Sequence, residues 1–127
     1  MHEASVVANI VDAVLEELKN HNVKKVHSVT LVIGELTMLG TDQMEFAYEI
    51  LTQDNILNGS KLIIEPEAVL LKCKSCGYEG PANRLDNGEY TGQEIPVLCC
   101  PKCGGHVEVL EGEACRVKCM DIETGDE

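Results

Sequence analysis

Two cysteine pairs constrain the fold of this chain more than any other feature of its sequence. Each pair has two residues between its thiols, and the pairs are Cys73 with Cys76 and Cys100 with Cys103. At this spacing a tight turn brings two thiolates to one face of a metal, and a glycine after each pair lets the chain turn away. Two such knuckles form one tetrahedral site that leaves no position for a substrate. The spacing therefore predicts a zinc-ribbon region with a structural zinc, in preference to reduced core cysteines or a redox pair.

The remaining thiols bear on the compartment and on the choice of metal ligands. The chain has seven cysteines, an odd number, and its N-terminus lacks the basic and apolar regions of a signal peptide. Such a set favours a reducing compartment, so we expect a cytoplasmic protein. Cys99 could compete with Cys100, but only Cys100 has the two-residue gap to Cys103. His106 could substitute for a ligand, although a polar loop residue is the favoured interpretation. The thiols expected to be free are Cys99, Cys115 and Cys119.

The region between the two pairs is polar and contains turn sequences such as Gly80-Pro81 and Asn87-Gly88. A region so poor in apolar residues cannot form a core of its own, so a metal must hold it together. The elements follow the order helix, strand, helix, strand, zinc region, strand, which predicts that the last strand rejoins the first sheet. The zinc region is then an insertion, and the expected domains are 1–68 together with 112–127, and 69–111.

Hydrophobic periodicity predicts the elements of the first domain. Residues 3–19 carry apolar residues at spacings of three and four, which is one face of a helix. Residues 25–36 are rich in β-branched side chains and predict a strand with one strongly apolar face, closed by Gly34. Because the chain has no Trp, one Phe and three Tyr, the core is expected to be aliphatic.

Thr41 or Asp42 can cap a second helix, since Glu45 follows Asp42 at the spacing of a capping box. The predicted buried face of this helix comprises Met44, Ala47, Tyr48 and Leu51. Asn58-Gly59 predicts a turn, and Pro66 is expected to separate two extended segments at 61–65 and 68–72.

Two more strands are predicted after the second cysteine pair, at 107–110 and 115–122. The apolar set of the second one is Cys115, Val117, Met120 and Ile122, and its change of parity predicts a bulge.

Charge and hydropathy disfavour two classes of partner, nucleic acids and membranes. The formal net charge is −12, from 22 acidic and 10 basic residues, and it would repel a phosphate backbone. Zinc ribbons that bind nucleic acid usually have a basic face, whereas this one has scattered lysines only, so nucleic acid is disfavoured. No stretch is long and apolar enough to span a bilayer, so a membrane is not expected as a partner.

The first three residues, Met1-His2-Glu3, offer a second kind of metal chemistry. A histidine near a chain end is usually solvated. However, a free α-amine, the His2 imidazole and deprotonated backbone amides can surround a metal in one plane. This nitrogen-rich geometry suits Ni(II) or Cu(II) and is poor for zinc.

Four features together resemble one family: the Met1-His2-Glu3 start, the strand end at residues 33–36 (Ile-Gly-Glu-Leu), the two cysteine pairs, and a closing strand at 116–118 (Arg-Val-Lys). The chain resembles HypA, the nickel metallochaperone family of hydrogenase maturation, over nearly its whole length. Many zinc ribbons share the cysteine pairs, whereas the terminal triplet combined with that strand end is specific.

The resemblance implies an α+β fold, with two helices packed on a three-stranded sheet and a four-cysteine zinc-ribbon (rubredoxin-knuckle-like) domain inserted before the last strand. It also implies delivery of Ni(II) rather than catalysis, so the protein is not expected to be an enzyme. The implied partners are the GTPase HypB and the large subunit of [NiFe] hydrogenase. The implied nickel ligands are the Met1 amine, the His2 side chain and backbone, and the Glu3 backbone. The implied zinc ligands are Cys73, Cys76, Cys100 and Cys103.

This sequence departs from some family members after each cysteine pair, where a histidine can replace a thiolate as pH changes. Here those positions are Gly77 and Gly104, which disfavours such a switch. Residues 93–98 contain no histidine either, so nickel ligands beyond the N-terminus are unassigned. The polar face of the first helix, including Glu16, Glu17 and Lys19, is expected to contact a partner.

Two other functions compete with nickel delivery. A zinc-ribbon adaptor would recognise another protein through its acidic surface and would bind no nickel. A metal-dependent enzyme finds little support, because the four-cysteine site is closed and no paired-carboxylate or phosphate-loop motif is present. Both a monomer and a homodimer are compatible with the sequence, since an inserted domain can exchange between protomers.

Overall fold

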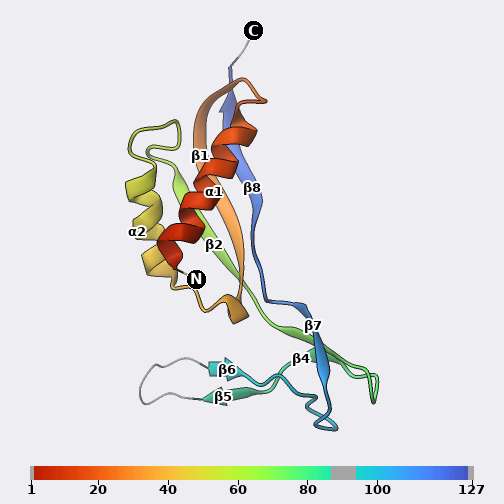
Figure 1. Ribbon diagram of the computed structural model, residues 1–127. Coiled ribbons are helices and arrows are strands. Elements are labelled where there is room, and N and C mark those ends of the chain that lie inside the picture. The colour runs from red at the N-terminus through yellow and green to blue at the C-terminus, as the bar shows by residue number, and fades with distance from the viewer. Residues whose placement is uncertain (1, 87–93, 126–127) are drawn as a thin grey trace. The chain divides into compact units, whose positions relative to one another are not determined.

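The computed structural model describes the backbone of residues 2–86 and 94–125 (Figure 1). The chain forms two compact units. We call residues 1–32, 38–65 and 115–127 the helical unit, and residues 33–37 and 66–114 the knuckle unit. Each unit is assembled from segments that are distant in the sequence. In the described residues, no helix has the length and apolar character that crossing a membrane would require.

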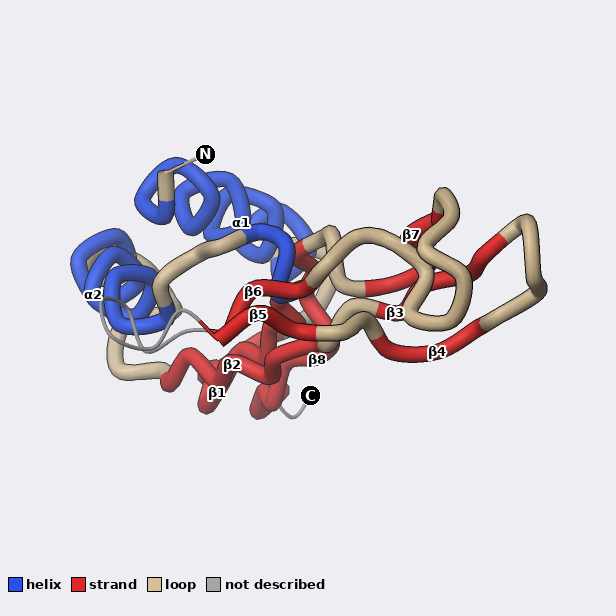
Figure 2. The backbone as a smooth tube through the Cα atoms, turned by 90° about the horizontal axis from the view of Figure 1, so that it is seen from below, coloured by secondary structure: helices blue, strands red, loops and turns tan. Residues whose placement is uncertain are grey.

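The helical unit consists of two helices on one face of a three-stranded sheet. The helices are α1 (Glu3–Leu18) and α2 (Thr41–Leu51), and the strands are β1 (Val23–Gly34), β2 (Lys61–Glu67) and β8 (Cys115–Thr124). The strand order is β2-β1-β8, so the last strand pairs with the first one. Figure 2 shows both helices in one layer and these strands in another. This arrangement confirms the predicted fold class and the return of the last strand to the first sheet.

The core of the helical unit is aliphatic, as the composition predicts. The apolar stripe of α1 buries Val7, Val11, Val14 and Leu18. The β-branched residues of α1 have low intrinsic helix propensity, so burial of this stripe supplies the stability of the helix. Leu31 of β1 and Met44 of α2 are 1% and 0% exposed, which places them at the centre of the packing.

The central strand β1 differs from its prediction. Val26 is buried and His27 is exposed, but every residue from Val29 to Gly34 is buried. One strongly apolar face was therefore the wrong interpretation, because both faces of the second half of this strand are covered. A continuous β-branched run is typical of a strand covered on both faces.

The second helix also begins and packs differently from its prediction. Its N-cap is Gly40, with no side-chain cap, so neither Thr41 nor Asp42 caps the helix. Met44, Ala47 and Tyr48 are buried as predicted, whereas Leu51 is 38% exposed and was assigned wrongly to the core. Leu51 is the last residue of α2, where the helix ends before its apolar stripe completes another turn.

Strand β2 continues through Pro66, which was expected to interrupt it. Because β2 is an edge strand, a residue without an N–H can be accommodated there without loss of a ladder hydrogen bond. The turn predicted before this strand is present, and Gly59 in it has a φ of 84°.

The knuckle unit contains two small antiparallel sheets. One has the order β4-β3-β7, from β4 (Glu79–Pro81), β3 (Leu70–Cys73) and β7 (Val107–Glu111). The other pairs β5 (Arg84–Asp86) with β6 (Glu94–Pro96). Among the residues that the structure describes, the buried apolar cluster around β3 in the knuckle unit is small, consisting of Val69, Leu71 and Ala82 with a few half-buried neighbours. The prediction that this region lacks a substantial core is thus consistent with its packing.

Residues 33–37 belong to the knuckle unit rather than to the helical unit. The N–H groups of Gly34 and Leu36 donate to the carbonyl oxygens of Ala114 (2.9 Å) and Gly112 (2.9 Å). Residues 35–37 then form a single turn of 3₁₀-helix, η1 (Glu35–Thr37). A Cβ atom at Gly34 would lie 2.2 Å from the backbone of Gly112, so only glycine permits this close approach.

Candidate metal sites

The two cysteine knuckles have matching backbone geometry. In each one the N–H of the glycine after the pair donates to the carbonyl of the first cysteine, at 3.0 Å from Gly77 to Cys73 and 2.9 Å from Gly104 to Cys100. Both glycines have positive φ, 81° and 73° respectively. This conformation is unfavourable for residues with a Cβ atom, so glycine is what allows each turn to close. The glycines after the cysteine pairs have the role that the sequence predicted.

The four thiols meet at one point. The sulfur atoms of Cys73, Cys76, Cys100 and Cys103 all lie within 4.8 Å of one another. The Sγ–Sγ distance is 3.6 Å from Cys73 to Cys103 and 3.5 Å from Cys76 to Cys100. Four thiolates held tetrahedrally at the usual zinc–sulfur bond length have their sulfurs about 3.8 Å apart. The cluster therefore fits a four-thiolate zinc, and Cys73 and Cys100 are buried while Cys76 and Cys103 are exposed.

The electrostatics of the cluster show why a cation suits it. Burial opposes ionisation of Cys100, but the N–H groups of Cys103 and Lys102, each 3.4 Å from its sulfur, lower the pKa of Cys100 to about 6. For Cys103 the N–H of Gly105 favours the thiolate, yet the neighbouring sulfurs of Cys73 and Cys100 raise its pKa to about 12. Four negative charges this close repel one another, so full ionisation of the cluster requires a metal ion.

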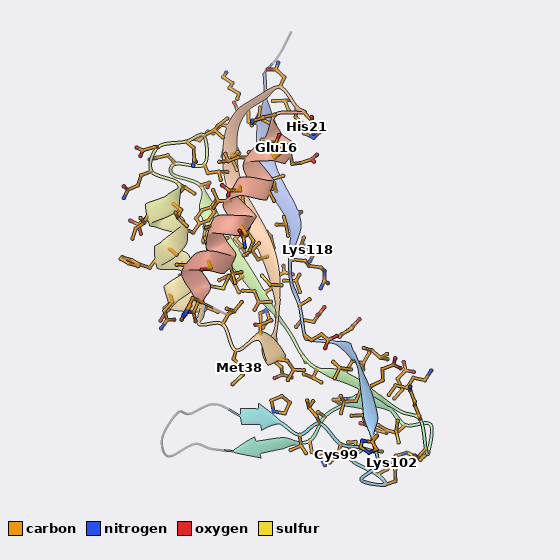
Figure 3. The ribbon with its side chains drawn as sticks, viewed as in Figure 1. Glu16, His21, Met38, Cys99, Lys102 and Lys118 are labelled. Carbon is orange, nitrogen blue, oxygen red and sulfur yellow. The ribbon has the colours of Figure 1, made fainter. Side chains whose placement is uncertain are left out.

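Neither Cys99 nor His106 belongs to the cluster. Cys99 is half-buried and His106 is exposed, and Figure 3 places Cys99 and Lys102 in the loops of the knuckle unit. The ammonium of Lys102 lies 5.7 Å from the centre of the Tyr78 ring, a cation–π distance. This contact joins a lysine of the second knuckle to the tyrosine that follows the first knuckle.

The predicted nickel site lies at the start of α1, and its Met1 is outside the described residues. His2 is the exposed N-cap of α1, with φ −97° and ψ 142°, and its carbonyl accepts the N–H of Val6 at 3.1 Å. The first N–H groups of a helix have no partner within the helix. The amides of His2 and Glu3 can consequently lose their protons to a metal without loss of a helical hydrogen bond. The positive end of the helix dipole would favour the resulting negative nitrogens.

The side chain of Glu3 has a contact that the sequence did not reveal. Its Oε2 accepts the N–H of Gly40 at 2.8 Å, and this bond lowers the pKa of the Glu3 carboxyl. Gly40 is the N-cap of α2, so Glu3 fastens the start of one helix to the start of the other. Glu3 and Gly40 are 37 residues apart in the sequence, so no local pattern could have indicated this bond.

Two further histidines and Glu35 have partners outside both metal sites. His21 pairs with Glu17 at 3.1 Å and His27 with Glu123 at 3.3 Å, on the surface of the helical unit. Glu35 accepts the N–H of Val69 through its Oε1 at 2.8 Å. This bond gives the Glu35 carboxylate a structural role within the knuckle unit.

The family described as "Hydrogenase/urease nickel incorporation, metallochaperone, hypA" matches residues 1–122. This chain belongs to the HypA family. The hydrogenase maturation factor HypA of Methanothermobacter thermautotrophicus is 38% identical, over 99% of this chain and 100% of that protein. HypA of Methanocella arvoryzae is 35% identical, over 97% of this chain and 99% of that protein.

Solved structures agree with this assignment. The solution structure of the Ni metallochaperone HypA from Helicobacter pylori is 26% identical and has a TM-score of 0.67, covering 98% of this chain and 100% of that one. A second HypA solution structure gives a TM-score of 0.69. Membership in the HypA family makes this chain a metallochaperone of nickel incorporation rather than an enzyme, and its four-cysteine cluster fits the structural zinc of that family.

Proposed function

We propose that this chain binds Ni(II) through the Met1 amine, the His2 imidazole and backbone, and the Glu3 backbone, and delivers it for maturation of [NiFe] hydrogenase. The position of His2 and Glu3 at the first turn of α1 supports this proposal most strongly. There the imidazole is exposed and the backbone amides are outside the helical hydrogen-bond ladder. Nitrogen ligands in one plane suit Ni(II).

The proposal extends to partners and to the second metal. Delivery requires an acceptor, and we propose the GTPase HypB and the hydrogenase large subunit as the proteins contacted. In the knuckle unit, Cys73, Cys76, Cys100 and Cys103 would hold Zn(II), which stabilises the fold and takes no part in transfer. A zinc-ribbon adaptor that binds no nickel is the competing function, and nickel titration separates the two.

The test is nickel titration of protein with its native N-terminus, by calorimetry and absorption. His2→Ala should abolish high-affinity binding, while His21→Ala, which removes an exposed histidine elsewhere in the same unit, should leave it unchanged. Binding should weaken as pH falls, because nickel displaces protons from the imidazole and the amides. An N-terminal extension should act like His2→Ala, since it converts the amine to an amide.

A matched pair of variants isolates the backbone of Glu3. Glu3→Pro removes the amide proton at a helix position where proline is well tolerated, so α1 should persist. Glu3→Ala keeps the amide and removes the carboxylate alone. We expect a much larger loss of nickel affinity in Glu3→Pro than in Glu3→Ala. Undiminished affinity in both His2→Ala and Glu3→Pro would show that nickel binds elsewhere.

A further inference from the structure

The two helices of the helical unit leave an open groove beside the predicted nickel site. Its volume is about 790 Å³, and His2 and Glu3 lie at its edge. α1 and α2 are in direct contact, and Figure 1 shows them side by side on the sheet. Small residues of α1 and larger apolar residues of α2 line the groove, among them Ala4, Ser5, Ala8, Phe46, Ile50 and Leu51.

The α2 side of the groove is an exposed apolar face. Phe46 is the only phenylalanine of the chain and is 66% exposed, and Ile50, one helical turn later, is 49% exposed. Met44 and Tyr48 on the opposite face are buried in the core. α2 therefore has two apolar faces, of which the core covers one. Contiguous exposed apolar surface of this kind marks an interaction site, and an apolar groove is the surface that receives the apolar face of an amphipathic helix.

Acidic side chains flank the exposed apolar face of α2. Asp42 and Glu49 lie at positions i−4 and i+3 from Phe46, both are exposed, and we call these two residues the acidic rim. The chain as a whole has a formal net charge of −12. The polar end of α1 is where the sequence predicts a partner contact, but its acidic side chains already have partners. There Glu16 pairs with Lys19 at 3.5 Å and Glu17 with His21. The acidic groups at that end have partners within the chain, whereas the groove has exposed apolar residues next to exposed acidic ones.

We propose that this groove docks an amphipathic helix of a nickel-handling partner protein. The apolar face of that helix covers Phe46 and Ile50, and its Lys and Arg side chains face the acidic rim. A second copy of this chain fits poorly, because its own acidic rim would face the first one. The proposal rests on the proposed function, since the occupant gains access to nickel by lying next to His2.

The experiment places a photo-crosslinking benzoyl-phenylalanine at position 46 of the full chain, in cells that assemble the hydrogenase. The matched control carries the same group at position 16, on the polar end of α1. Position 46 should give at least about tenfold more crosslinked product, as expected for an interface anchor. Mass spectrometry should map it to a segment of another protein with helical apolar periodicity and an excess of Lys and Arg. Crosslinks to this same chain, to an acidic segment or to lipid would overturn the proposal, as would stronger crosslinking from position 16 or none from position 46.

A synthetic peptide of the crosslinked segment then measures the contact quantitatively. Phe46→Ser should weaken its binding at least about tenfold, and 0.5 M salt should weaken it further by screening the rim. Met38→Ser removes an exposed apolar side chain outside the groove and should leave the affinity unchanged. Equal affinity of the Phe46→Ser and unaltered proteins for the peptide would show that the groove is not its docking site.

Nickel titration distinguishes failure of the docking proposal from failure of the proposed function. The Phe46→Ser protein should bind nickel normally. A protein that binds the peptide but not nickel would overturn the proposed function alone, and one that binds nickel but not the peptide would overturn the docking groove alone.

Discussion

The knuckle unit and the helical unit reach a stable fold by different means. The helical unit buries long aliphatic side chains of two helices and a sheet, with Leu31 and Met44 almost fully enclosed. The knuckle unit has a small buried cluster around Val69 and Leu71, together with four convergent thiols. A segment too small to bury enough apolar surface can still fold when a metal supplies the missing free energy. The comparison predicts that the two units respond differently to metal removal, core truncation and loss of single hydrogen bonds.

The largest effect should come from the thiols. Cys73→Ala, or chelation of the metal, should unfold the knuckle unit, because a structural zinc contributes on the order of 10 kcal/mol to folding. Amide hydrogen exchange followed by NMR should show loss of protection in residues 69–111, the proposed zinc domain, and retained protection in α1. Cys119→Ala is the control, since this exposed thiol is outside the cluster. Ordered residues 73–103 in metal-free protein would contradict the structural role of zinc.

Truncation of the helical core should produce the converse result. Met44→Ala should lower the free energy of unfolding of the helical unit by about 2–5 kcal/mol, because it removes a fully buried side chain and leaves a cavity. Urea unfolding monitored by circular dichroism measures this change, and zinc affinity should remain as before. Met38→Ala is the matched control, since Met38 is 62% exposed and its truncation should change stability little. Loss of zinc from the Met44→Ala protein would show that the units do not have independent stabilities.

The two units also differ in how far the sequence predicts them. The knuckles depend on local geometry, in which a two-residue spacing and a following glycine determine the turn, so the thiol cluster could be foreseen. The contact of Glu3 with Gly40 and the position of residues 33–37 depend on segments distant in the chain. The exposure of Phe46 was not predictable either, because hydrophobic periodicity identifies apolar residues but cannot tell a core-facing position from a partner-facing one. β1 was misjudged for a related reason, since alternation of apolar residues does not reveal that both faces are covered.

A smaller effect should follow from removal of the Glu35 carboxylate, which the sequence placed in a motif without revealing its contact. Glu35→Ala leaves the Val69 N–H without this acceptor and should lower the stability of the knuckle unit by about 1–3 kcal/mol. Hydrogen exchange at the Val69 amide, in zinc-loaded protein, reports it directly. Glu35→Gln retains a carbonyl acceptor at the same position and should recover most of the loss. Unchanged exchange in Glu35→Ala would show that this bond contributes nothing to the unit.

The smallest effect should come from one buried hydroxyl of the helical unit. The Tyr48 hydroxyl lies 2.6 Å from Ser60 Oγ, and Ser60 also donates to the carbonyl of Leu57 at 2.6 Å. Tyr48→Phe therefore leaves Ser60 with a partner, and the loss should be about 1 kcal/mol at neutral pH. Tyr78→Phe is the matched control, because it removes a hydroxyl that donates to Pro81 in the knuckle unit and should not change the unfolding of the helical unit.

Tyr48 also makes the stability of the helical unit depend on pH at the alkaline end. Burial raises the pKa of Tyr48 above its ordinary value of 10.0, against the opposing effect of the Ser60 hydrogen bond. The folded protein therefore retains a phenol proton that the unfolded chain releases, and the associated stability is complete below pH 10 and is lost as the pH rises above it. Urea midpoints measured from pH 8 to 11 should fall less steeply at the alkaline end in Tyr48→Phe than in the unaltered protein. Parallel curves for the two proteins would mean that this phenol ionises as easily in the folded state as in the unfolded chain, contrary to its burial on the core-facing side of α2.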